Sequence, residues 1–499
     1  MMLVELVERL GGRCGLEGTG PEVSGVQLDS RRVGPGDLFV ALRGESQDGR
    51  EYISQALTAG ACAILLEGEP PPAAVGAPIW EHPQARAVAG RAASLLHGRP
   101  SKALDVFAVT GTNGKTTTAH LLGELLAGLG RTPAVLGTAG HRLAGGEALS
   151  ATHTTPDAPT LQALLARHRE QGGDAAVLEV SSHALLQERT AGLEIDYALY
   201  TNLSHDHLDY HGDMQHYAEA KSLMFSSLDS NAIAIVNADD DYSAMMAEAA
   251  RAKGATVVTY GGLKNGTDAQ CDLRASQLEL DSGITYLTLS GMGISQARLR
   301  IPLSGRFNVA NALAASAAVL MSGASPSAVV EGLASVSSPP GRLEPVPAPP
   351  GVQAPGLTVL VDYAHTPDAL ASVLDALRET LEPGRRLICV FGCGGERDTG
   401  KRGPMGRAAA ERADLVVLTS DNPRGEDPEQ ILSQVRAGAH GGAVVEEQPD
   451  RRLAIRQALA AGRDGDVLLI AGKGHETVQL VGGQAVDFDD RRVAEEEWR

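Results

Sequence analysis

The stretch DVFAVTGTNGKTTTAHLLGELLAGLG, residues 105–130, decides the fold. It opens with an apolar run typical of a buried strand, continues through a glycine-rich turn, and ends with leucines on one face of a helix, from Leu121 to Leu129. Glycines let the backbone curl so that successive N–H groups point at phosphate oxygens, and a helix N-terminus adds partial positive charge. This strand–turn–helix unit predicts a nucleotide-binding α/β domain.

The turn departs from the common phosphate-binding loop. That pattern requires a glycine five residues before Gly114, where this chain has Val109, so a shorter variant, G-T-N-G-K-T, remains. In this variant Lys115 would reach the outer phosphates and Thr116 could hold Mg²⁺. A kinase, an ATPase and a ligase could all carry such a loop. The predicted nucleotide contacts are Gly111, Thr112, Asn113, Gly114, Lys115, Thr116 and Thr117.

Outside this unit, apolar β-rich runs are followed at once by polar residues. AAVLEVSSH leads to Glu179, DYALYTNLSHDH to His207, LTVLVDYAHTP to Asp362, LVVLTSDNPR to Arg424 and VLLIAGKGHE to Lys473. Continuous apolar strands that alternate with helical patterns predict parallel sheets covered on both faces. Ligands bind beyond the carboxyl ends of such strands, so these polar residues are candidates for binding and catalysis.

The length of 499 residues predicts more than one domain, and the pattern divides into three. Residues 1–101 hold short strand-like runs, residues 102–337 contain the phosphate loop, and residues 338–499 form a further α/β domain. The junction SSPPGRLEPVPAPPGVQAPG, at 337–356, is crowded with prolines. Because proline removes a donor and fixes φ, we expect no regular element there.

Composition excludes several classes of protein. The net charge of −19 argues against nucleic acid or an anionic membrane as a partner. Glu5 and Glu8 interrupt the first apolar stretch, which favours an amphipathic helix over a secretory signal, and no uncharged run approaches the ~20 residues of a membrane span. Five scattered cysteines form no disulfide framework, and we expect Cys389 and Cys393 to be buried thiols. We therefore expect a cytoplasmic protein.

An ordered series of motifs extends over nearly the whole chain and resembles the Mur ligase family. Folylpolyglutamate synthases share the loop but lack the long first domain. The resemblance implies a small α/β N-terminal domain, a central P-loop-type ATPase domain with a mostly parallel sheet, and a C-terminal Rossmann-like domain. The motifs are LDSRRVGPGDLFVAL at 28–42, HTTP at 153–156, EVSSHAL at 179–185, NLSHDHLDYHGDM at 202–214, YAEAK at 217–221, GRFNVANALAA at 305–315, PPGR at 339–342, DYAHTPDAL at 362–370, GCGGERDTGKR at 392–402, DNPR at 421–424 and GKGHE at 472–476.

The family's chemistry explains why such residues are needed. A carboxylate is a poor acyl donor, so ATP first converts it into an acyl phosphate, which an amine then attacks. The carboxylate and the γ-phosphoryl group are both negatively charged and repel each other. Catalysis therefore consists mostly of positioning the reactants and neutralising their charge. The resemblance implies ATP, two Mg²⁺ ions, and Lys115, Glu179, His207 and Lys221 as catalytic residues.

The implied metal ligands are Thr116, Glu179, His207 and Lys221. An ammonium has no acceptor, so Lys221 would serve only as a carbamate formed with CO₂, as the matching lysine does in the family. From spacing alone, an ordinary surface lysine is the simpler interpretation. His205, His207 and His211 could suggest zinc, but no further ligand completes a tetrahedral set.

The resemblance also assigns binding residues for a UDP-linked muramoyl peptide and for the nucleotide. We assign no side-chain contacts to GESQDG at 44–49, which departs from the family. The hydroxyl-bearing residues could equally be turn residues or helix caps. Leu28 and Ser30 are expected at the uridine diphosphate; Thr154, Thr155, Ser181, Gln187 and Arg189 at the muramoyl peptide; and Asn308, Arg342 and Asp362 around the base, hinge and ribose of the nucleotide.

The choice of amino acid rests on the last domain. Meso-2,6-diaminopimelate ends in an ammonium and a carboxylate, whereas lysine ends in an ammonium alone. Arg424 offers a planar fork for that carboxylate, and lysine-adding relatives lack it. DNPR could otherwise be a polar turn. The expected amino-acid contacts are Arg397, Asp421, Asn422, Pro423, Arg424, Gly472 and Glu476.

The expected reaction joins meso-2,6-diaminopimelate to the D-glutamate of UDP-N-acetylmuramoyl-L-alanyl-D-glutamate. We expect a monomer with no nucleic-acid or membrane partner. Rival ligases add lysine or D-alanyl-D-alanine, and DNPR argues against both. An inactive nucleotide-binding regulator and a small-molecule kinase are the alternatives from other classes; a kinase would form ADP without requiring an amine.

Overall fold

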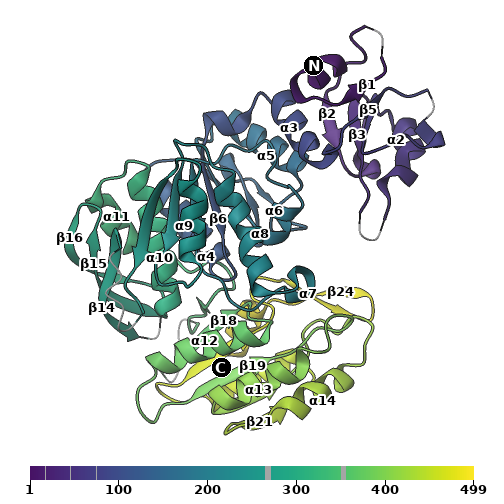
Figure 1. The fold of residues 1–499 in the computed structure, drawn as a ribbon. Helices are drawn as coiled ribbons and strands as arrows, with labels where there is room; N and C mark the ends of the chain where they lie inside the picture. Colours follow the sequence, from purple (N-terminus) through teal and green to yellow (C-terminus); the bar gives the residue numbers. More distant parts are fainter. Residues whose placement is uncertain are drawn as a thin grey trace. The chain divides into compact units, whose positions relative to one another are not determined.

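The computed structural model describes residues 1–16, 18–44, 47–74, 76–264, 271–281, 283–349 and 356–498. Its sheets are flanked by helices, as the α/β prediction required (Figure 1). By contacts, the chain divides into two compact units. The first unit contains 1–115, 126–236 and 240–258, and the second contains 116–125, 237–239 and 259–499.

A small sheet begins the first unit, with strand order β1-β5-β4-β3-β2. Its strands β2 to β5 are parallel, and β1 is an antiparallel edge. The apolar runs LFVA and AILL supply its buried centre. The predicted N-terminal amphipathic helix is present and buries Leu3 and Leu6. The elements are α1 (Leu3–Leu10), β1 (Arg13–Cys14), β2 (Gly25–Gln27), β3 (Asp37–Ala41), α2 (Ile53–Ala59), β4 (Ala63–Leu66), β5 (Ile79–Glu81) and α3 (Ala85–Leu96).

The larger sheet of the first unit has strand order β12-β11-β6-β10-β7-β8-β9. The first five of these strands are parallel. The strand β6 (Asp105–Thr110) pairs with β11 on one side and β10 on the other, so the strand order reverses at β6. A ligand crevice is expected beyond the carboxyl end of such a strand, and the phosphate loop begins there. The other elements are β7 (Pro133–Gly137), β8 (Gly140–Arg142), β9 (Ala148–Leu149), α5 (Ala158–Glu170), β10 (Ala175–Glu179), α6 (Ser182–Leu186), β11 (Tyr197–Tyr200), α7 (Leu208–His211), α8 (Met214–Ser226), β12 (Ile233–Asn237) and α9 (Ser243–Arg251).

The helix after the loop, α4 (Lys115–Gly128), ends one residue earlier than the leucine pattern predicted. Leu129 lies beyond it and is 36% exposed, whereas Leu121, Leu122, Leu125 and Leu126 are buried. Gly128 and Gly130 flank Leu129, and glycine favours a helix end over a helix interior.

The second unit contains an antiparallel meander and two helices before its main sheet. The meander is formed by β14 (Leu273–Asp281), β15 (Ile284–Gly291) and β16 (Ile294–Ile301), and β13 (Thr256–Gly261) pairs with β14 in parallel. The helix α10 (Arg306–Met321) is rich in alanine and largely buried, and α11 (Pro326–Leu333) follows it.

The main sheet of the second unit has strand order β17-β18-β22-β19-β20-β21, parallel except for β17. Alternate strand residues pack on opposite faces: Phe391 lies in the cluster with α12, α13 and α14, and Val390 in the cluster with α15 and α16. The elements are β17 (Glu344–Pro345), β18 (Thr358–Asp362), α12 (Pro367–Thr380), β19 (Leu387–Phe391), α13 (Arg402–Arg412), β20 (Leu415–Leu418), α14 (Pro428–Gly438), β21 (Val444–Glu447), α15 (Arg451–Ala461), β22 (Val467–Ala471) and α16 (Asp490–Glu497).

An ion pair joins the two helices on one face of this sheet. Arg451 of α15 and Asp490 of α16 are fully buried and 2.7 Å apart, and Val493 and Ala494 of α16 complete the apolar cluster beside them. Both thiols predicted to be buried, Cys389 and Cys393, are buried in the opposite cluster, and burial raises the pKa of each to about 12.

Two elements differ from the sequence expectation. The proline-rich junction contains the short strand β17, which pairs with β18 through Glu344 and Pro345, so the expectation of no regular element was wrong. A proline is tolerated there because β17 is an edge strand. The hairpin of β23 (Val478–Val481) and β24 (Gln484–Asp487) was not predicted. Gly482 and Gly483 form its turn with positive φ, which favours glycine.

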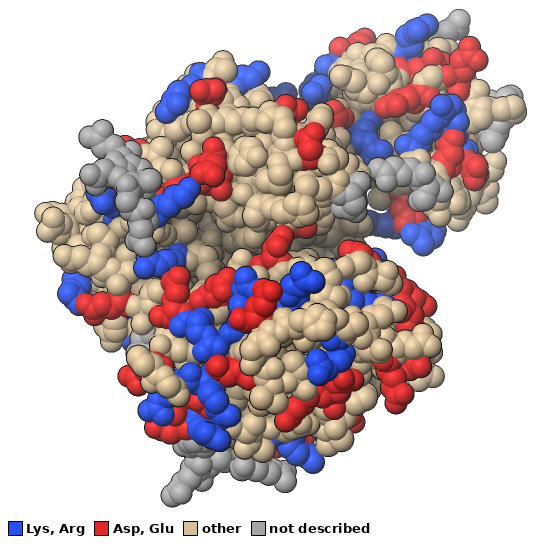
Figure 2. Space-filling model, turned by 60° about the horizontal axis from the view of Figure 1, so that its bottom comes forward, with Lys and Arg blue, Asp and Glu red and all other residues tan. Residues whose placement is uncertain are grey.

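Within the described ranges, no helix has the length and apolar character needed to cross a bilayer. On the face drawn in Figure 2, acidic and basic side chains are interspersed.

Candidate active site

The phosphate loop is pinned to the end of β11. The backbone N–H of Thr112 donates to the Asn202 carbonyl at 2.8 Å, and that of Asn113 donates to the Asn202 side-chain oxygen at 3.0 Å. The Thr201 hydroxyl donates to the Asn113 carbonyl at 2.6 Å. A Cβ at Gly111 would lie 1.9 Å from Thr201 Oγ1, so this position requires glycine. The loop is therefore shaped before any ligand binds.

Two lysines converge on the same loop carbonyl. Lys115 Nζ donates to the carbonyls of Gly111 and Thr112 at 2.9 and 2.8 Å, and Lys221 Nζ donates to that of Gly111 at 2.8 Å. Lys221 is 1% exposed, which excludes the surface-lysine interpretation, and its Nζ lies 4.4 Å from the centre of the Tyr217 ring. Burial, and then the charge of Lys115, hold the pKa of Lys221 well below its usual range.

Glu179 ends β10 and is buried at the same edge of the sheet. Its carboxylate accepts from the backbone N–H of Thr138 at 3.0 Å and from the Thr138 hydroxyl at 3.1 Å. The Thr155 hydroxyl donates to the Glu179 carbonyl at 2.8 Å, and the hydroxyls of Thr154 and Thr138 are 3.0 Å apart. Thr155 thus contacts the backbone of Glu179, and Thr154 contacts the threonine that holds its carboxylate.

The remaining residues expected at the muramoyl peptide lie on the adjoining segment. Arg189 donates to the Thr155 carbonyl at 2.9 Å and to Gln187 Oε1 at 2.8 Å. Burial lowers the pKa of its guanidinium. The Ser181 hydroxyl accepts from the Ala184 N–H, so it does cap α6, and the Ser181 N–H donates to Thr155 Oγ1. Thr155 therefore links Glu179, Ser181 and Arg189.

The three histidines occupy different environments. His207 has a half-exposed side chain and a positive φ, and its ring packs edge-on against His183 at 4.9 Å. His211 is buried, lies 2.9 Å from the Ser182 hydroxyl, and stacks on Tyr217, and His205 is exposed. In the part of the chain that is described, no group of three histidine, cysteine or acidic residues is arranged to hold a metal.

The residues expected to bind metal can be compared with the needs of Mg²⁺, which prefers oxygen ligands. Thr116, in the first turn of α4, offers a hydroxyl, and Glu179 offers a carboxylate at a strand end. An unmodified Lys221 offers no oxygen, whereas a carbamate would add two. The residues fit a hard cation only if Lys221 is modified.

The first unit also contains a cavity of about 590 Å³ that brings Leu28 and Ser30 together. The Ser30 hydroxyl donates to Gln55 Oε1 at 3.1 Å, and Tyr52 and Arg86 lie in the same wall. Glu45 and Ser46, within the segment to which no contacts were assigned, lie outside the described residues.

In the second unit, a buried chain of polar side chains surrounds Asn308. The Thr118 hydroxyl donates to Asn311 Oδ1 at 3.2 Å, Asn311 donates to Asn308 Oδ1 at 3.2 Å, and Asn308 donates to the Ser304 carbonyl at 2.9 Å. Thr117, next to Thr118, is also buried.

Asp362 and Arg342 lie together at the end of β18. The Asp362 carboxylate accepts from the N–H groups of Leu343 and Ala364 at 2.8 Å each, and burial raises its pKa although Arg342 lowers it. The Arg342 guanidinium lies 4.8 Å from the centre of the Tyr363 ring, and its buried Nε has no hydrogen-bond partner among the described residues. Tyr363, which sequence reasoning missed, provides a stacking face beside the expected nucleotide contacts.

Arg424 is fixed on both its backbone and its side chain. Its N–H donates to the Leu480 carbonyl at 2.9 Å and its carbonyl accepts from the Gly482 N–H at 2.7 Å, so the unpredicted hairpin holds the DNPR turn. Its guanidinium donates to the Gly395 carbonyl at 2.6 Å. Arg397, two residues after Gly395, is exposed. The structure therefore places both arginines at one loop.

Lys473 is a candidate from the strand-end pattern to which the family resemblance gave no role. It is fully buried, and its Nζ donates to the Val478 carbonyl at 2.7 Å, to Glu476 Oε2 at 3.2 Å and to Asn422 Oδ1 at 3.3 Å. Asn422 donates in turn to Glu476 Oε2 at 2.9 Å. Lys473 thus holds the side chains of two expected amino-acid contacts, from the position directly after a buried strand that the sequence pattern singled out.

The other assigned residues of this site lie around that network. Asp421 is almost fully buried with Lys473 Nζ 3.8 Å away, and burial raises the pKa of Asp421. Pro423 is buried, and Gly472 has a positive φ of 112°. Arg402, also missed, is 1% exposed and donates to the Gly394 carbonyl and to Glu426, which fastens the loop that carries Arg397.

Comparison with known proteins agrees with this arrangement. Three family models match successive stretches: the Mur ligase family catalytic domain at 22–108, the Mur ligase middle domain at 109–319, and the Mur ligase glutamate ligase domain at 341–474. The chain therefore belongs to the Mur ligase family, as its motifs predicted, and the three-domain α/β architecture is confirmed.

Two curated relatives are similar over almost their whole length. The UDP-N-acetylmuramoyl-L-alanyl-D-glutamate–2,6-diaminopimelate ligase of Geobacillus thermodenitrificans (strain NG80-2) is 40% identical, over 99% of this chain and 98% of that protein. The protein of the same name from Chromobacterium violaceum is 43% identical, over 96% of this chain and 95% of its own. A solved structure of a ligase with this name has a TM-score of 0.70 at 35% identity, covering 100% of this chain and 98% of that one.

Proposed function

We propose that this chain is an ATP-dependent ligase that joins meso-2,6-diaminopimelate to the D-glutamate of UDP-N-acetylmuramoyl-L-alanyl-D-glutamate, a step of peptidoglycan precursor synthesis. The observation that carries the choice of amino acid is Arg424, whose backbone and guanidinium are both held in place next to the loop of Arg397. A fixed guanidinium matches the distal carboxylate of diaminopimelate and repels the lone distal ammonium of lysine.

The phosphate loop supports the first half of the reaction. ATP would be held by Gly111 to Thr117, with Lys115 released from the loop carbonyls to neutralise the outer phosphates. The glutamate carboxylate oxygen attacks the γ-phosphorus, ADP leaves, and an acyl phosphate forms. The amine then attacks the acyl carbon, loses a proton and expels phosphate. Asn308, Arg342 and Asp362 would bind the remainder of the nucleotide.

The same proposal includes two Mg²⁺ ions and a carbamate on Lys221. When bound, the ions would neutralise charge between the phosphates and the carboxylate. Thr116, Glu179, His207 and the modified Lys221 would hold them. Carbamate formation requires an uncharged amine, whose nitrogen attacks the carbon of CO₂ and then loses a proton. The burial of Lys221 against Gly111 and Tyr217 supports this modification, because a low-dielectric site disfavours the ammonium.

Substrate positions follow from the cavities and hydrogen bonds. Leu28 and Ser30 would contact the uridine diphosphate, and Thr154, Thr155, Ser181, Gln187 and Arg189 the muramoyl peptide. Asp421, Asn422, Pro423, Arg424, Arg397, Gly472 and Glu476 would receive the amino acid. We assign these roles to domains at 1–101, 102–337 and 338–499 of a cytoplasmic monomer.

The test is phosphate release with ATP, Mg²⁺ and the UDP-linked dipeptide against a panel of amino acids, with the product identified by mass. We expect meso-2,6-diaminopimelate to give the highest kcat/KM and lysine to be a poor substrate. A preference for lysine would contradict the assignment of Arg424. ADP formed without any amine would indicate a kinase or an ATPase, and no turnover with any amino acid would indicate a regulator.

A further inference from the structure

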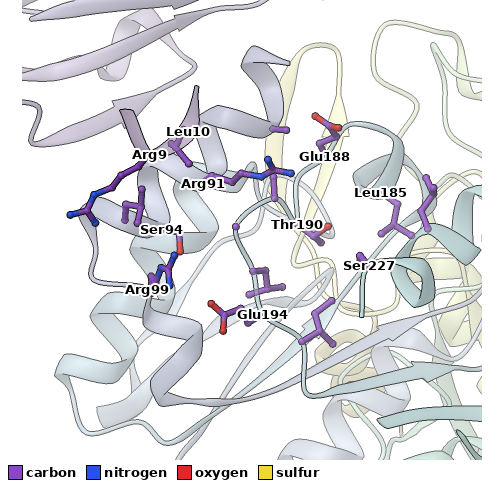
Figure 3. Close-up of a pocket in the computed structure, with 17 residues that line it drawn as sticks. Arg9, Leu10, Arg91, Ser94, Arg99, Leu185, Glu188, Thr190, Glu194 and Ser227 are labelled. Carbon is purple, nitrogen blue, oxygen red and sulfur yellow. The ribbon is translucent and has the colours of Figure 1, made fainter. Parts of the chain in front are cut away.

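A cavity of about 810 Å³ lies in the first unit, apart from the residues assigned above (Figure 3). One wall is formed by α3 and the loop after it, with Arg91, Ser94 and Arg99. The opposite wall is the segment 188–195, which contributes Glu188, Thr190 and Glu194. Its volume falls within the ~300–1,000 Å³ typical of small-molecule sites.

This cavity is distinct from the one that contains Ser30. Arg86 of α3 lines that other cavity, whereas Arg91 lines this one. Five residues along a helix place two side chains about 140° apart, so the two cavities lie on different faces of α3. On the opposite wall, Arg189 points to the Thr155 carbonyl, while its neighbour Glu188 lines the cavity.

The two walls are held together by close backbone packing. A Cβ at Gly90 would lie 2.4 Å from the Ala191 carbonyl oxygen, and a Cβ at Gly192 would lie 2.7 Å from the Gly90 carbonyl oxygen. These distances leave no room for a Cβ at position 90 or 192, and the contact fixes α3 against the segment 188–195. The cavity beside this contact is therefore a built feature of the unit.

The polar groups of the α3 wall lack protein partners. Across the described residues, the side chains of Arg91 and Arg99 form no ion pair and no hydrogen bond, whereas Arg9 is paired with Glu5 at 2.6 Å. Ser94 lines the cavity and is 5% exposed; its hydroxyl makes no hydrogen bond within the described ranges, and its oxygen is not one of the fully buried unpaired atoms. Arg91 and Arg99 are exposed, so their guanidinium groups are open to a ligand beside the Ser94 hydroxyl. This wall therefore offers donors to an anion.

Acidic and apolar groups limit what that anion can be. Glu194 lies 3.8 Å from Lys102, and Glu188 lies on the wall opposite Ser94, so a large polyanion is disfavoured. Leu185, Leu193 and Leu223 add apolar surface, and Leu223 is 43% exposed. A small anionic head with a short apolar body suits both sets of groups.

We propose that this cavity is a second ligand site, which binds an amphiphilic anion through Arg91, Ser94 and Arg99 and places its apolar part against the leucines. The head group is a carboxylate or a phosphate monoester, since a guanidinium and a hydroxyl bind either. The proposal does not depend on the ligase activity.

The experiment is calorimetric titration of the full chain with octanoate and with octyl phosphate, in excess ADP and UDP so that the phosphate loop and the other cavity are filled. We expect one site per chain for the better of the two probes, which identifies the head group. Inorganic phosphate and 1-octanol should bind at least roughly tenfold more weakly, because each lacks one half of the ligand.

Variants decide where the probe binds. Arg91→Gln, Arg99→Gln and Ser94→Ala should each weaken the better probe, roughly tenfold for the arginines and a few-fold for the serine. Arg251→Gln, an exposed arginine on α9 that lines neither cavity, should leave it unchanged. Equal binding of 1-octanol, or wild-type affinity in both arginine variants, would overturn the proposal. Ligase activity of Arg99→Gln should stay normal, which confirms that the variant is folded.

Discussion

The phosphate loop and the amino-acid end are built in opposite ways. The loop is shaped by backbone: Gly111 has no room for a Cβ, and Thr112 and Asn113 are pinned by main-chain N–H groups. The amino-acid end is shaped by side chains: buried Lys473 links Asn422 to Glu476, and a hairpin holds Arg424. A backbone site tolerates variation around its glycines, whereas a side-chain network fails when one member changes. Substitutions in one region should therefore change binding of its own substrate and leave binding at the other region unchanged.

Lys221 should give the largest effect, because its carbamate would supply the oxygen ligands that a metal beside the loop needs. We expect Lys221→Ala and Lys221→Arg to reduce kcat at least ~10³-fold while ATP still binds, since neither can form a carbamate. With ¹³CO₂, wild type should show a carbamate signal in ¹³C NMR that both variants lack. An active Lys221→Arg enzyme would refute the role, and Lys253→Ala, an exposed lysine, is the matched control.

Arg424 tests the side-chain half of the comparison. Truncating one partner of a buried charged pair costs about 2–5 kcal/mol, so Arg424→Ala should lose roughly 30- to 3,000-fold in kcat/KM for meso-2,6-diaminopimelate. The KM values for ATP and the UDP-linked dipeptide should change little, because those substrates meet other residues. Steady-state kinetics with each substrate varied would show this. Arg407→Ala, an exposed arginine on α13, should behave as wild type.

Lys473 belongs to the side-chain network of the amino-acid end, and its substitution should have a smaller effect than that of Arg424. Lys473→Met keeps the bulk but removes three hydrogen bonds, so Glu476 and Asn422 lose their orientation. We expect KM for the amino acid to rise roughly 30-fold, with kcat at saturation reduced much less. A variant that lost only thermal stability, with KM unchanged, would show that Lys473 is structural and does not position the site. Lys253→Met is the control.

Gly111 tests the backbone half and should give the smallest effect. A Cβ there would lie 1.9 Å from Thr201 Oγ1, and overpacking of this kind costs about 1–3 kcal/mol. We expect Gly111→Ala to raise KM for ATP roughly tenfold and to lower the denaturation midpoint, with KM for the amino acid unchanged. Gly128→Ala, at the end of the helix α4 that follows the loop and with open space where its Cβ would lie, should be neutral or slightly stabilising.

These two regions also differ in how far sequence could predict them. The loop, β6 and the strands β18, β20 and β22 of the last sheet were predictable because each is a local run whose residues pack where the pattern places them. The β23–β24 hairpin was not, because VQLV and QAVD are only four residues each and neither contributes a buried residue. The role of Lys473 depends on Asn422, 51 residues earlier, and the Gly90–Gly192 contact joins segments that share no sequence signal. Contacts between residues far apart in the sequence, and not the local conformational preference of a segment, determine such features.

The buried ion pair between Arg451 and Asp490 has a consequence for the order of biosynthesis. Asp490 is made 39 residues after Arg451, which at about 5–20 residues per second is a delay of roughly 2–8 s on the ribosome. Until then the guanidinium lacks its counterion, and the face of the last sheet that Val493 and Ala494 cover stays open. This sheet therefore closes only when α16 has left the ribosome, and a chain stalled before Asp490 would present an exposed apolar face to chaperones and proteases.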